Sequence, residues 1–524
     1  MPRPRINLDL YRYQIEEWRA DDAITIQEIQ RRLKEEYNIS ASATTLWRSL
    51  RNWGSDMKRG KTEDTEELRT RIKQLFFQFV LNDHFILRQL QDEGFTITPT
   101  GLTRIRRDLG LWRRQDPGTL DVQLARLREF FETDSERSTM LRTYGRTYLY
   151  TYIRQNYHVL SRDVIYHAFR EFYPRDVTQR WNAMRYRRVG WTCPGPDFIW
   201  SIDAHDKLKH WGFEIYASID AYSRYITWFY IGISASTARS VVGQYLSVLQ
   251  AKGVMPYLVR SDRGGETVLM AGAHFYLSQH RLRKRDGVEG PITFRQCWIY
   301  GKSTANEKIE SWWLRFSQGR GGFWRKFFQD LSNDGSWVSD SLADRIALLY
   351  IYMPILREEF ASFVMMWNSH RIRKQPNRPH VIPGQPYVLY HQAEAHHARN
   401  FAEVVPQDRL QSLQQIYESD PYDLDAYLPD DTIDVCRTFT NGYEETGPSQ
   451  GRGDSAETPF LSSYLALREY LRRHIRNDAS AMVGLLESPT GGLDRLSEYL
   501  AEHNIDMEEI GGEIDNTSDE EYNF

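Results

Sequence analysis

Three acidic residues that interrupt apolar segments place the strongest constraint on the fold. Asp203 lies in the apolar run that begins at Phe198, Asp262 ends a second run that begins at Tyr257, and Glu310 lies one to two turns into a predicted helix. Burying a carboxylate in or at the end of an apolar strand is costly unless it is paired or holds a metal. Two such strands and a helix can bring three carboxylates together, which is what a two-metal phosphoryl-transfer site requires.

Length and composition indicate a large globular protein. A chain of 524 residues is expected to hold three or more domains. Its content of 41% hydrophobic and 13% aromatic residues is typical of folded proteins. No segment approaches the ~18 uninterrupted apolar residues of a membrane helix, and the N-terminal residues lack the apolar core of a signal peptide. We therefore expect a soluble, intracellular protein with no membrane partner.

The cysteines and histidines do not form a recognisable metal or disulfide pattern. Cys193, Cys297 and Cys436 are far apart and form no CxxC pair. His396 and His397 are the one adjacent pair of histidines, and no cysteine lies near them. A zinc module is therefore not predicted.

The net charge of −4 hides a sharp division along the chain. Residues 1–390 carry 58 Lys and Arg against 43 Asp and Glu, whereas residues 391–524 carry 9 against 28. A basic body favours a polyanionic partner whose binding weakens with salt. The acidic C-terminal part is interpreted as a solvating tail, the alternative being an internal competitor for the basic surface.

Three helical units follow one another in the basic half. Each combines a helix, a polar turn and a second helix with arginines on one face, at about 22–54, 66–112 and 148–170. This is the helix-turn-helix arrangement, whose second helix can enter the DNA major groove, although many helical hairpins bind nothing. The groove candidates from these units are Arg48, Arg51, Arg104, Arg106 and Arg107.

Beyond residue 190 the pattern changes from helices to short strands. Strands are predicted at 199–204, 213–219, 225–231, 257–261 and 292–298, with helices at 237–251, 266–280 and from Ser303. This order predicts a mixed sheet with helices. Residues 340–369 and much of 388–436 are predicted to be helical.

The segments between 190 and 390 resemble the retroviral integrase and transposase superfamily, which has an RNase H-like fold. The resemblance rests on five motifs in order. They are Trp200-Ser-Ile-Asp203, Asp220-Ala-Tyr-Ser-Arg224, Arg260-Ser-Asp262-Arg-Gly-Gly-Glu266, Ser303-Thr-Ala-Asn306-Glu-Lys-Ile-Glu310-Ser-Trp-Trp313 and Trp367-Asn-Ser-His370. The variant with Asp203-Ala-His-Asp-Lys-Leu208 is similar to the transposon-derived eukaryotic integrase core domain proteins.

With this resemblance, the expected fold class is a multi-domain protein. N-terminal all-α helix-turn-helix units precede an α/β RNase H-like integrase catalytic core, a helical C-terminal region and an acidic tail. The expected parts are two helix-turn-helix units at 1–60 and 61–120, a third helical unit with a basic connector at 121–190, the core at 191–390, a helical extension at 391–437, a flexible linker at 438–460, a short helical segment at 461–500 and an acidic disordered tail at 501–524.

The resemblance implies that Asp203, Asp262 and Glu310 are the DDE triad, catalytic and metal-binding at once. In that family the triad holds two Mg²⁺ or Mn²⁺ ions, and carboxylate oxygens suit such hard ions. The implied reactions are DNA 3′-end processing and strand transfer on double-stranded DNA, by a homo-oligomer in the nucleus. Asn306 and Glu266 are expected to support the ligands, Glu266 alternatively being an acid at a helix N-terminus.

Two features depart from the retroviral pattern. The spacing of 48 residues from Asp262 to Glu310 is longer than usual, which fits a basic insertion at 281–290, and the zinc-binding N-terminal module is absent. Glu307 competes with Glu310 for the third acidic position. If Thr304 is the N-cap, Glu307 completes a capping box, which leaves Glu310 as the ligand.

Further cations are predicted to contact DNA around the core. Trp312 and Trp313 are predicted to be core residues rather than base-stacking ones, and Asp220 is predicted to fix a strand turn. The additional DNA-contact candidates are Lys207, Lys209, Arg283, Lys284, Arg285, Lys302 and Lys308, together with the basic, aromatic segment from Arg320 to Lys326.

Three functions are compatible with this sequence. The first is a metal-dependent DNA recombinase of the integrase or transposase type. The second is a domesticated, transposon-derived DNA-binding protein that no longer cuts. The third is an RNase H-like nuclease acting on RNA or hybrids, against which the helix-turn-helix units argue.

Overall fold

The computed structural model divides the chain into two compact units. The first comprises Met1–Arg71 and Asp83–Gly110, and the second comprises Ile72–Asn82 and Leu111–Phe524. The residues described are 8–12, 14–15, 18, 25–53, 62–113, 120–137, 141, 144–156, 159–173, 193–262, 264–285, 288–301, 306–375, 381–396, 398–419, 422–446, 458–477, 483–488, 494–508 and 510–511. Most of the predicted basic connector before residue 190 lies outside them.

The first unit contains helices where the N-terminal pair is predicted. Helices α2 (Ile26–Tyr37) and α3 (Ala43–Asn52) are joined by a short polar turn. Thr25 caps α2 by accepting a hydrogen bond from the backbone of Glu28, and Asn38, with a φ of 54°, ends the helix in the left-handed conformation. Isoleucines and leucines from both helices are buried in one small core.

A second helical pair follows in the same unit. Helices α5 (Asp83–Asp92) and α6 (Pro99–Asp108) again flank a turn, and Thr98 caps α6 by accepting from the backbone of Gly101. Pro99 occupies the first position of α6, where its missing N–H costs nothing. Helix α4 (Glu66–Phe77) begins in the first unit and ends in the second.

The second unit includes three helices, after α4, that pack into a shared core with the sheet and the long helix α15 (Leu342–Ser369). They are α7 (Leu120–Arg137), α8 (Arg146–Gln155) and α9 (Arg162–Phe172), and Ser161 caps the last of them. Their buried side chains belong to the same hydrophobic core as those of α15.

The predicted mixed sheet is present, with strand order β3-β2-β1-β5-β8. Strand β1 pairs antiparallel with β2 and parallel with β5, while β2–β3 is antiparallel and β5–β8 is parallel. The strands are β1 (Ile199–His205), β2 (Glu214–Asp220), β3 (Ile226–Gly232), β5 (Leu258–Ser261) and β8 (Trp298–Tyr300).

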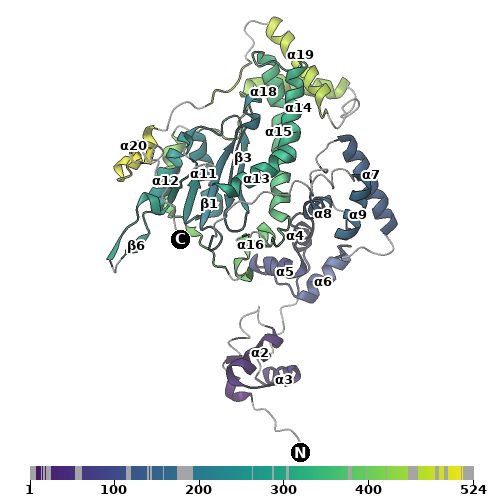
Figure 1. The fold of residues 1–524 in the computed structure, drawn as a ribbon, viewed down its shortest axis with the longest axis vertical. Coiled ribbons are helices and arrows are strands. Elements are labelled where there is room, and N and C mark those ends of the chain that lie inside the picture. Colours follow the sequence, from purple (N-terminus) through teal and green to yellow (C-terminus); the bar gives the residue numbers. More distant parts are fainter. Residues whose placement is uncertain are drawn as a thin grey trace, which may run out of the picture. The chain divides into compact units, whose positions relative to one another are not determined.

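Helices cover both faces of this sheet (Figure 1). One face packs against α11 (Ala238–Lys252) and α12 (Val268–Ser278), and the other packs against α13 (Glu307–Gln318) and α15. Successive side chains of a strand point to opposite faces. Trp200 and Ile202 are in the α11–α12 core, so the odd-numbered residues of β1 face α13.

The segment between α12 and β8 differs from the prediction. The basic insertion forms a hairpin of β6 (Leu282–Arg285) and β7 (Val288–Pro291) that extends away from the sheet (Figure 1). The strand predicted at 292–298 begins only at Trp298, because residues before it form a 3-10 turn, Phe294–Gln296, with a capping box between Thr293 and Gln296.

The region predicted to be helical between 388 and 436 is more varied than expected. It contains helices and a short strand, β9, that pairs antiparallel with β4. The elements of this region are α16 (Pro386–His391), a 3-10 turn (Ala393–His396), β9 (Glu403–Val404), α17 (Gln407–Glu418) and α18 (Asp430–Thr446). The partner strand β4 (Val254–Met255) lies earlier in the chain, after α11.

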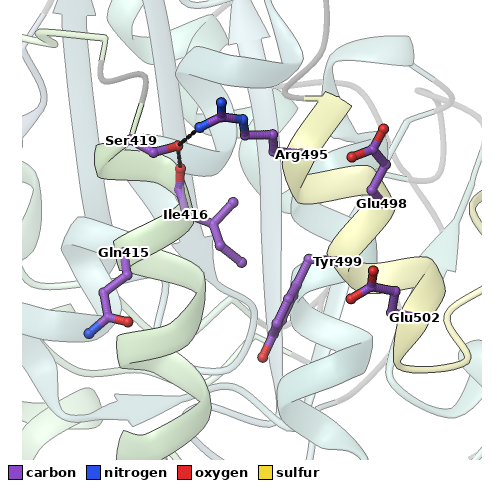
Figure 2. A pocket seen from close by; sticks show the side chains of 7 residues that line it. All are labelled: Gln415, Ile416, Ser419, Arg495, Glu498, Tyr499 and Glu502. Atoms are coloured by element: carbon purple, nitrogen blue, oxygen red, sulfur yellow. Dashed lines mark hydrogen bonds between the residues drawn. The ribbon is translucent and has the colours of Figure 1, made fainter.

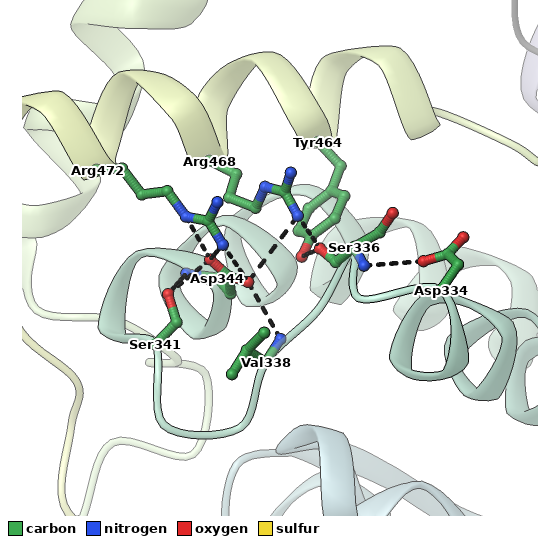
Figure 3. Close-up of polar contacts among 8 residues, drawn as sticks. All are labelled: Asp334, Ser336, Val338, Ser341, Asp344, Tyr464, Arg468 and Arg472. Carbon is green, nitrogen blue, oxygen red and sulfur yellow. Dashed lines mark hydrogen bonds and ion pairs between the residues drawn. The ribbon is translucent and has the colours of Figure 1, made fainter.

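A buried carboxylate fastens the C-terminal helix α19 (Leu461–Asn477) to the body (Figure 3). Asp344 of α15 is fully buried and accepts hydrogen bonds from Arg472 at 2.8, 2.9 and 3.0 Å. Arg468 lies 4.0 Å from the same carboxylate, and the backbone of Val338 also donates to it. The predicted short helical segment is therefore an integral part of the helical layer.

The acidic tail predicted to be disordered from residue 501 is folded in its described part. Helix α20 (Asp494–Glu502) and the following turn bury Ile505 and Ile510 in the α11–α12 core. Alternating hydrophobic residues in this acidic stretch explain the difference, because they supply an apolar face that net charge conceals. Residues 512–524 lie outside the described residues.

A shallow cavity of about 360 Å³ separates α17 and α20 (Figure 2). Among the helices that the structure describes, none is long and apolar enough to cross a membrane.

Candidate active site

Asp203 lies on the β1 face that is covered by α13. Burial and the nearby negative charges of Asp262 and Glu310 raise its pKa to about 8. An opposing effect comes from Trp313, whose indole Nε1 donates a hydrogen bond to Asp203 Oδ2 at 3.0 Å. The three acids identified in the sequence are thus close enough to influence one another electrostatically.

Sheet register explains how Asp262 comes near Asp203. Strands β1 and β5 are parallel and pair Ser201 with Arg260, so continuing this register by two residues brings Asp203 level with Asp262. Asp262 follows the last residue of β5, where the chain leaves the sheet. Burial, with a further contribution from Asp206, raises its pKa.

Glu310 reaches the same region from the first turn of α13. Asn306 is the N-cap residue of this helix, and its side-chain amide donates a hydrogen bond to the backbone carbonyl of Ile202 at 3.0 Å. This bond ties the start of α13 to the strand residue that precedes Asp203. The supporting role predicted for Asn306 stays a prediction, and this bond is the contact through which Asn306 would exert it.

Glu307 does not have the capping role predicted for it. Helix α13 begins at Glu307 itself, so this residue is the first of the helix rather than the third, and no capping box forms with it. The reason is that Asn306 takes the N-cap position, while Thr304 lies outside the described residues. The Glu307 carboxylate raises the pKa values of Arg260 and Lys308 against the effect of burial, which indicates that it faces these cations.

The three acids do not surround a common point closely. In the parts of the chain that the structure describes, no three His, Cys, Asp or Glu side chains are grouped tightly enough to hold a metal ion. The chemistry of the donor set nevertheless fits a hard divalent cation, because the charges of Asp262 and Glu310 both act on Asp203 and the three acids offer only carboxylate oxygens.

The neighbouring acids Glu266 and Asp220 have different surroundings. Glu266 lies in the 3-10 turn (Gly265–Thr267) that leads into α12, and burial with the nearby charge of Asp262 raises its pKa. Asp220 is buried and accepts hydrogen bonds from the backbone of Asp197 and from both the backbone and hydroxyl of Ser223. Its role in fixing a strand turn is as predicted.

Three of the cations predicted to touch DNA are engaged elsewhere. Lys308 has only 3% of its surface exposed because it lies on the buried side of α13. Arg106 is 7% exposed and pairs with Asp83 at 3.2 Å. Lys209 donates to Ser236 at 2.6 Å and pairs with Glu214. Lys308 and Arg106 are thus buried in this structure, and Lys209 already has protein partners.

The other cations predicted to contact DNA are either exposed or outside the described part of the chain. Lys207, Arg48, Arg104 and Arg107 are exposed. The side chains of Arg51, Arg283, Lys284 and Arg285, and the whole of Lys302, lie outside the described residues.

The hydrogen bond from Trp313 to Asp203 is a contact of the candidate site that the sequence analysis did not predict. Trp313 is buried, as predicted, with 4% of its surface exposed, yet its N–H reaches the first acid of the site. Its spacing of three residues from Glu310 places both on one face of the helix. The spacing of three residues between Glu310 and Trp313 is the sequence signal that could have predicted this contact.

Comparison with known protein families supports the same assignment. Residues 191–398 match the family model described as Integrase core domain. No curated protein matches the chain. The matched segment contains the five-stranded sheet, Asp203, Asp262 and Glu310. Residues 191–398 are therefore similar to the integrase core domain, which supports an integrase- or transposase-like protein with an RNase H-type fold in this segment.

Proposed function

We propose that this protein is a metal-dependent polynucleotidyl transferase that cleaves DNA and joins DNA ends. The observation that best supports this is the position of Asp203, where burial and then the nearby charges of Asp262 and Glu310 raise its pKa to about 8. Partly buried acids that repel one another favour a cation between them. An oxygen-only ligand set suits Mg²⁺ or Mn²⁺.

Different side chains of the candidate site are proposed to bind metal and to position the metal ligands. The carboxylates of Asp203, Asp262 and Glu310 would hold two divalent ions, which when bound activate water or a DNA 3′-hydroxyl and stabilise the leaving oxygen. Trp313 would orient Asp203 by holding its Oδ2 atom. Asn306 keeps α13, and with it Glu310, against β1.

DNA binding is proposed for the helical pairs and the basic surface. Arg48 on α3 and Arg104 and Arg107 on α6 are exposed on the second helix of their pairs, which is the helix that enters the major groove in helix-turn-helix proteins. The β6–β7 hairpin has the form of a two-stranded ribbon, which the major groove can also admit. Double-stranded DNA as substrate, a homo-oligomeric assembly and a nuclear location follow from the same proposal.

The direct test is nicking and strand joining by the full-length protein. Supercoiled plasmid and a labelled duplex with a free 3′-hydroxyl are incubated with Mg²⁺, Mn²⁺ or EDTA. We expect metal-dependent nicking and transfer of the label into the plasmid. Both should vanish in Asp203→Asn and persist in Asp408→Asn, which removes an exposed acid from α17. Activity that survives Asp203→Asn excludes the proposal.

The same preparations distinguish the other two functions. A domesticated DNA-binding protein would bind duplex with steep salt dependence yet show no heat of Mg²⁺ or Mn²⁺ binding by calorimetry. An RNase H-like nuclease would cut an RNA–DNA hybrid in preference to duplex DNA.

A further inference from the structure

A cavity of about 410 Å³ opens close to Asp203, between the end of β1 and the junction of α13 with α14 (Arg320–Asn333). Its lining includes His205 and Lys207, which follow Asp203 in the chain, and Ser317, which is near the end of α13. The remaining polar side chains come mainly from α14. They include Arg325, Lys326 and Asp330.

The charge of the cavity is positive and locally uncompensated. Lys207, Arg325 and Lys326 are exposed, and none of them forms an ion pair with any residue that the structure describes. Other cations of the same body are paired, for example Arg320 with Glu359 at 3.1 Å. Three unpaired cations around one hollow, against a single lining carboxylate from Asp330, favour an anionic ligand.

His205 adds a buried polar group without a protein partner. The residue is 6% exposed, and its Nε2 lies 3.0 Å from the hydroxyl of Ser317. Its Nδ1 atom is buried and has no hydrogen-bond partner among the described residues. A buried polar atom is rarely left without a partner in a native protein, so this one indicates a ligand or water that the protein atoms alone do not supply.

The cavity is physically connected to the acid that begins the site. Asp203 and His205 lie on the same face of β1, two residues and therefore about 6.7 Å apart along the strand. The ring of Trp313 links them, because its nitrogen donates to Asp203 while its centroid lies 4.8 Å from that of His205. One extended strand of nucleic acid can reach both places.

We propose that this cavity seats a backbone phosphate of the DNA strand next to the one that reacts. Lys207, Arg325 and Lys326 supply its countercharges, and the His205–Ser317 pair forms its floor. The inference rests on the proposed function for the identity of the strand. Gly321 and Gly322 allow the close approach of α14 to α13 that shapes the cavity, since a Cβ at Gly322 would come within 2.0 Å of the carbonyl of Ser317.

The test uses full-length protein with Arg325→Gln and Lys326→Gln combined. Both side chains are exposed, so the fold is expected to survive. Binding of a labelled duplex with a single-stranded 3′ end is followed by fluorescence anisotropy at several salt concentrations. Neutralising two phosphate contacts should reduce the slope of log K against log salt by about 1.4 to 1.8. The matched control, Arg345→Gln with Arg476→Gln, removes two exposed arginines elsewhere and should reduce it by much less.

A methylphosphonate scan locates the contact. Each phosphate near the 3′ end is replaced in turn by a neutral methylphosphonate. In the wild-type protein one position close to the reacting phosphate should weaken binding about 5- to 10-fold, and in the double variant the same position should become silent. An unchanged scan in the double variant overturns the proposal.

The methylphosphonate scan and the cleavage assay can fail independently, so the phosphate site and the proposed function are tested separately. A phosphate position that responds to the double variant, in a protein that never cuts DNA with metal, supports the subsite and rejects the catalytic proposal. Cleavage with a scan that the double variant leaves unchanged does the reverse.

Discussion

The indole nitrogen of Trp313 donates a hydrogen bond to Oδ2 of Asp203 at 3.0 Å, while the indole nitrogen of the adjacent Trp312 is buried without a hydrogen-bond partner among the described residues. Both tryptophans pack in the same core, so the pair offers an internal comparison. One N–H acts on a candidate metal ligand, and the other does not.

Trp313→Phe is expected to lower the rate of DNA cleavage by roughly 10- to 100-fold. A hydrogen bond to a charged group contributes about 1.5–3 kcal/mol, and losing it frees Asp203 to rotate. The bond also lowers the pKa of Asp203, so the acidic limb of the rate against pH should move to higher pH. Trp312→Phe is the control and should keep the wild-type pH profile. Identical profiles for both variants contradict the role given to Trp313.

Asp203→Asn is expected to stabilise the metal-free protein at neutral and alkaline pH. The folded pKa of about 8 exceeds the ordinary value of about 3.9, so between these limits the folded state holds a proton that the unfolded state has released. Stability from this group is therefore full below about pH 4 and is lost as pH rises through about 8. The thermal transition in EDTA should fall less with rising pH in the variant than in the wild type.

Mg²⁺ should make the wild type more stable than Asp203→Asn, the opposite of the order expected in EDTA. An ion that binds only the folded protein adds about 2.7 kcal/mol of stability at a concentration one hundred times its Kd. The wild type should gain this stabilisation and Asp203→Asn should not, whereas Asp408→Asn should respond as the wild type does. Equal responses to Mg²⁺ in all three proteins contradict the metal assignment.

Glu310→Gln and Glu307→Gln should separate the two acids at the start of α13. Metal ions stabilise charge in the transition state by several kcal/mol, so loss of a ligand should reduce cleavage by about a hundredfold or more. Glu307 faces Arg260 and Lys308, and its replacement should leave cleavage near the wild-type rate. Single-turnover rates with labelled duplex provide the comparison. The assignment fails if Glu307→Gln is the inactive variant.

Asp344→Ala should destabilise the helical layer by about 1.5–3 kcal/mol, because Arg472, whose side chain is 32% exposed, loses a charged and buried hydrogen-bond partner. Denaturant unfolding measures this loss, with the exposed Asp340→Ala as control. Adding Arg472→Leu should recover part of the stability, since a buried ion pair can often be replaced by apolar groups. No recovery would indicate that the packing of α19 depends on something other than this charge pair.

Periodic features were predictable from the sequence, whereas burial on a helix face was not. The strands that carry Asp203 and precede Asp262 are apolar runs bounded by turns, and the mixed sheet followed from their order. From the sequence, Lys308 is expected to be exposed, as most lysines are. In the structure it is buried, because parts of the chain far away in sequence cover its face of α13. No local pattern records such a covering.

The beginning of α13 illustrates a second limit. Ser303 and Thr304 are good N-cap residues by type, but Asn306 takes that position because its amide finds the carbonyl of Ile202, 104 residues earlier. A contact of this separation is invisible to capping rules. The same limit explains why the acidic segment after residue 501 was expected to be disordered, since Ile505 and Ile510 become buried only against the α11–α12 core.

The hydrogen bond from Asn306 to Ile202 bears on whether the acids of the candidate site can be replaced without loss of the fold around them. It joins the strand that bears one acid to the helix that bears another, and no carboxylate takes part in it. This contact therefore does not depend on the acids of the candidate site, and losing Asp203 would relieve repulsion from Asp262 and Glu310. Replacing the acids one at a time should therefore leave this contact between β1 and α13 in place.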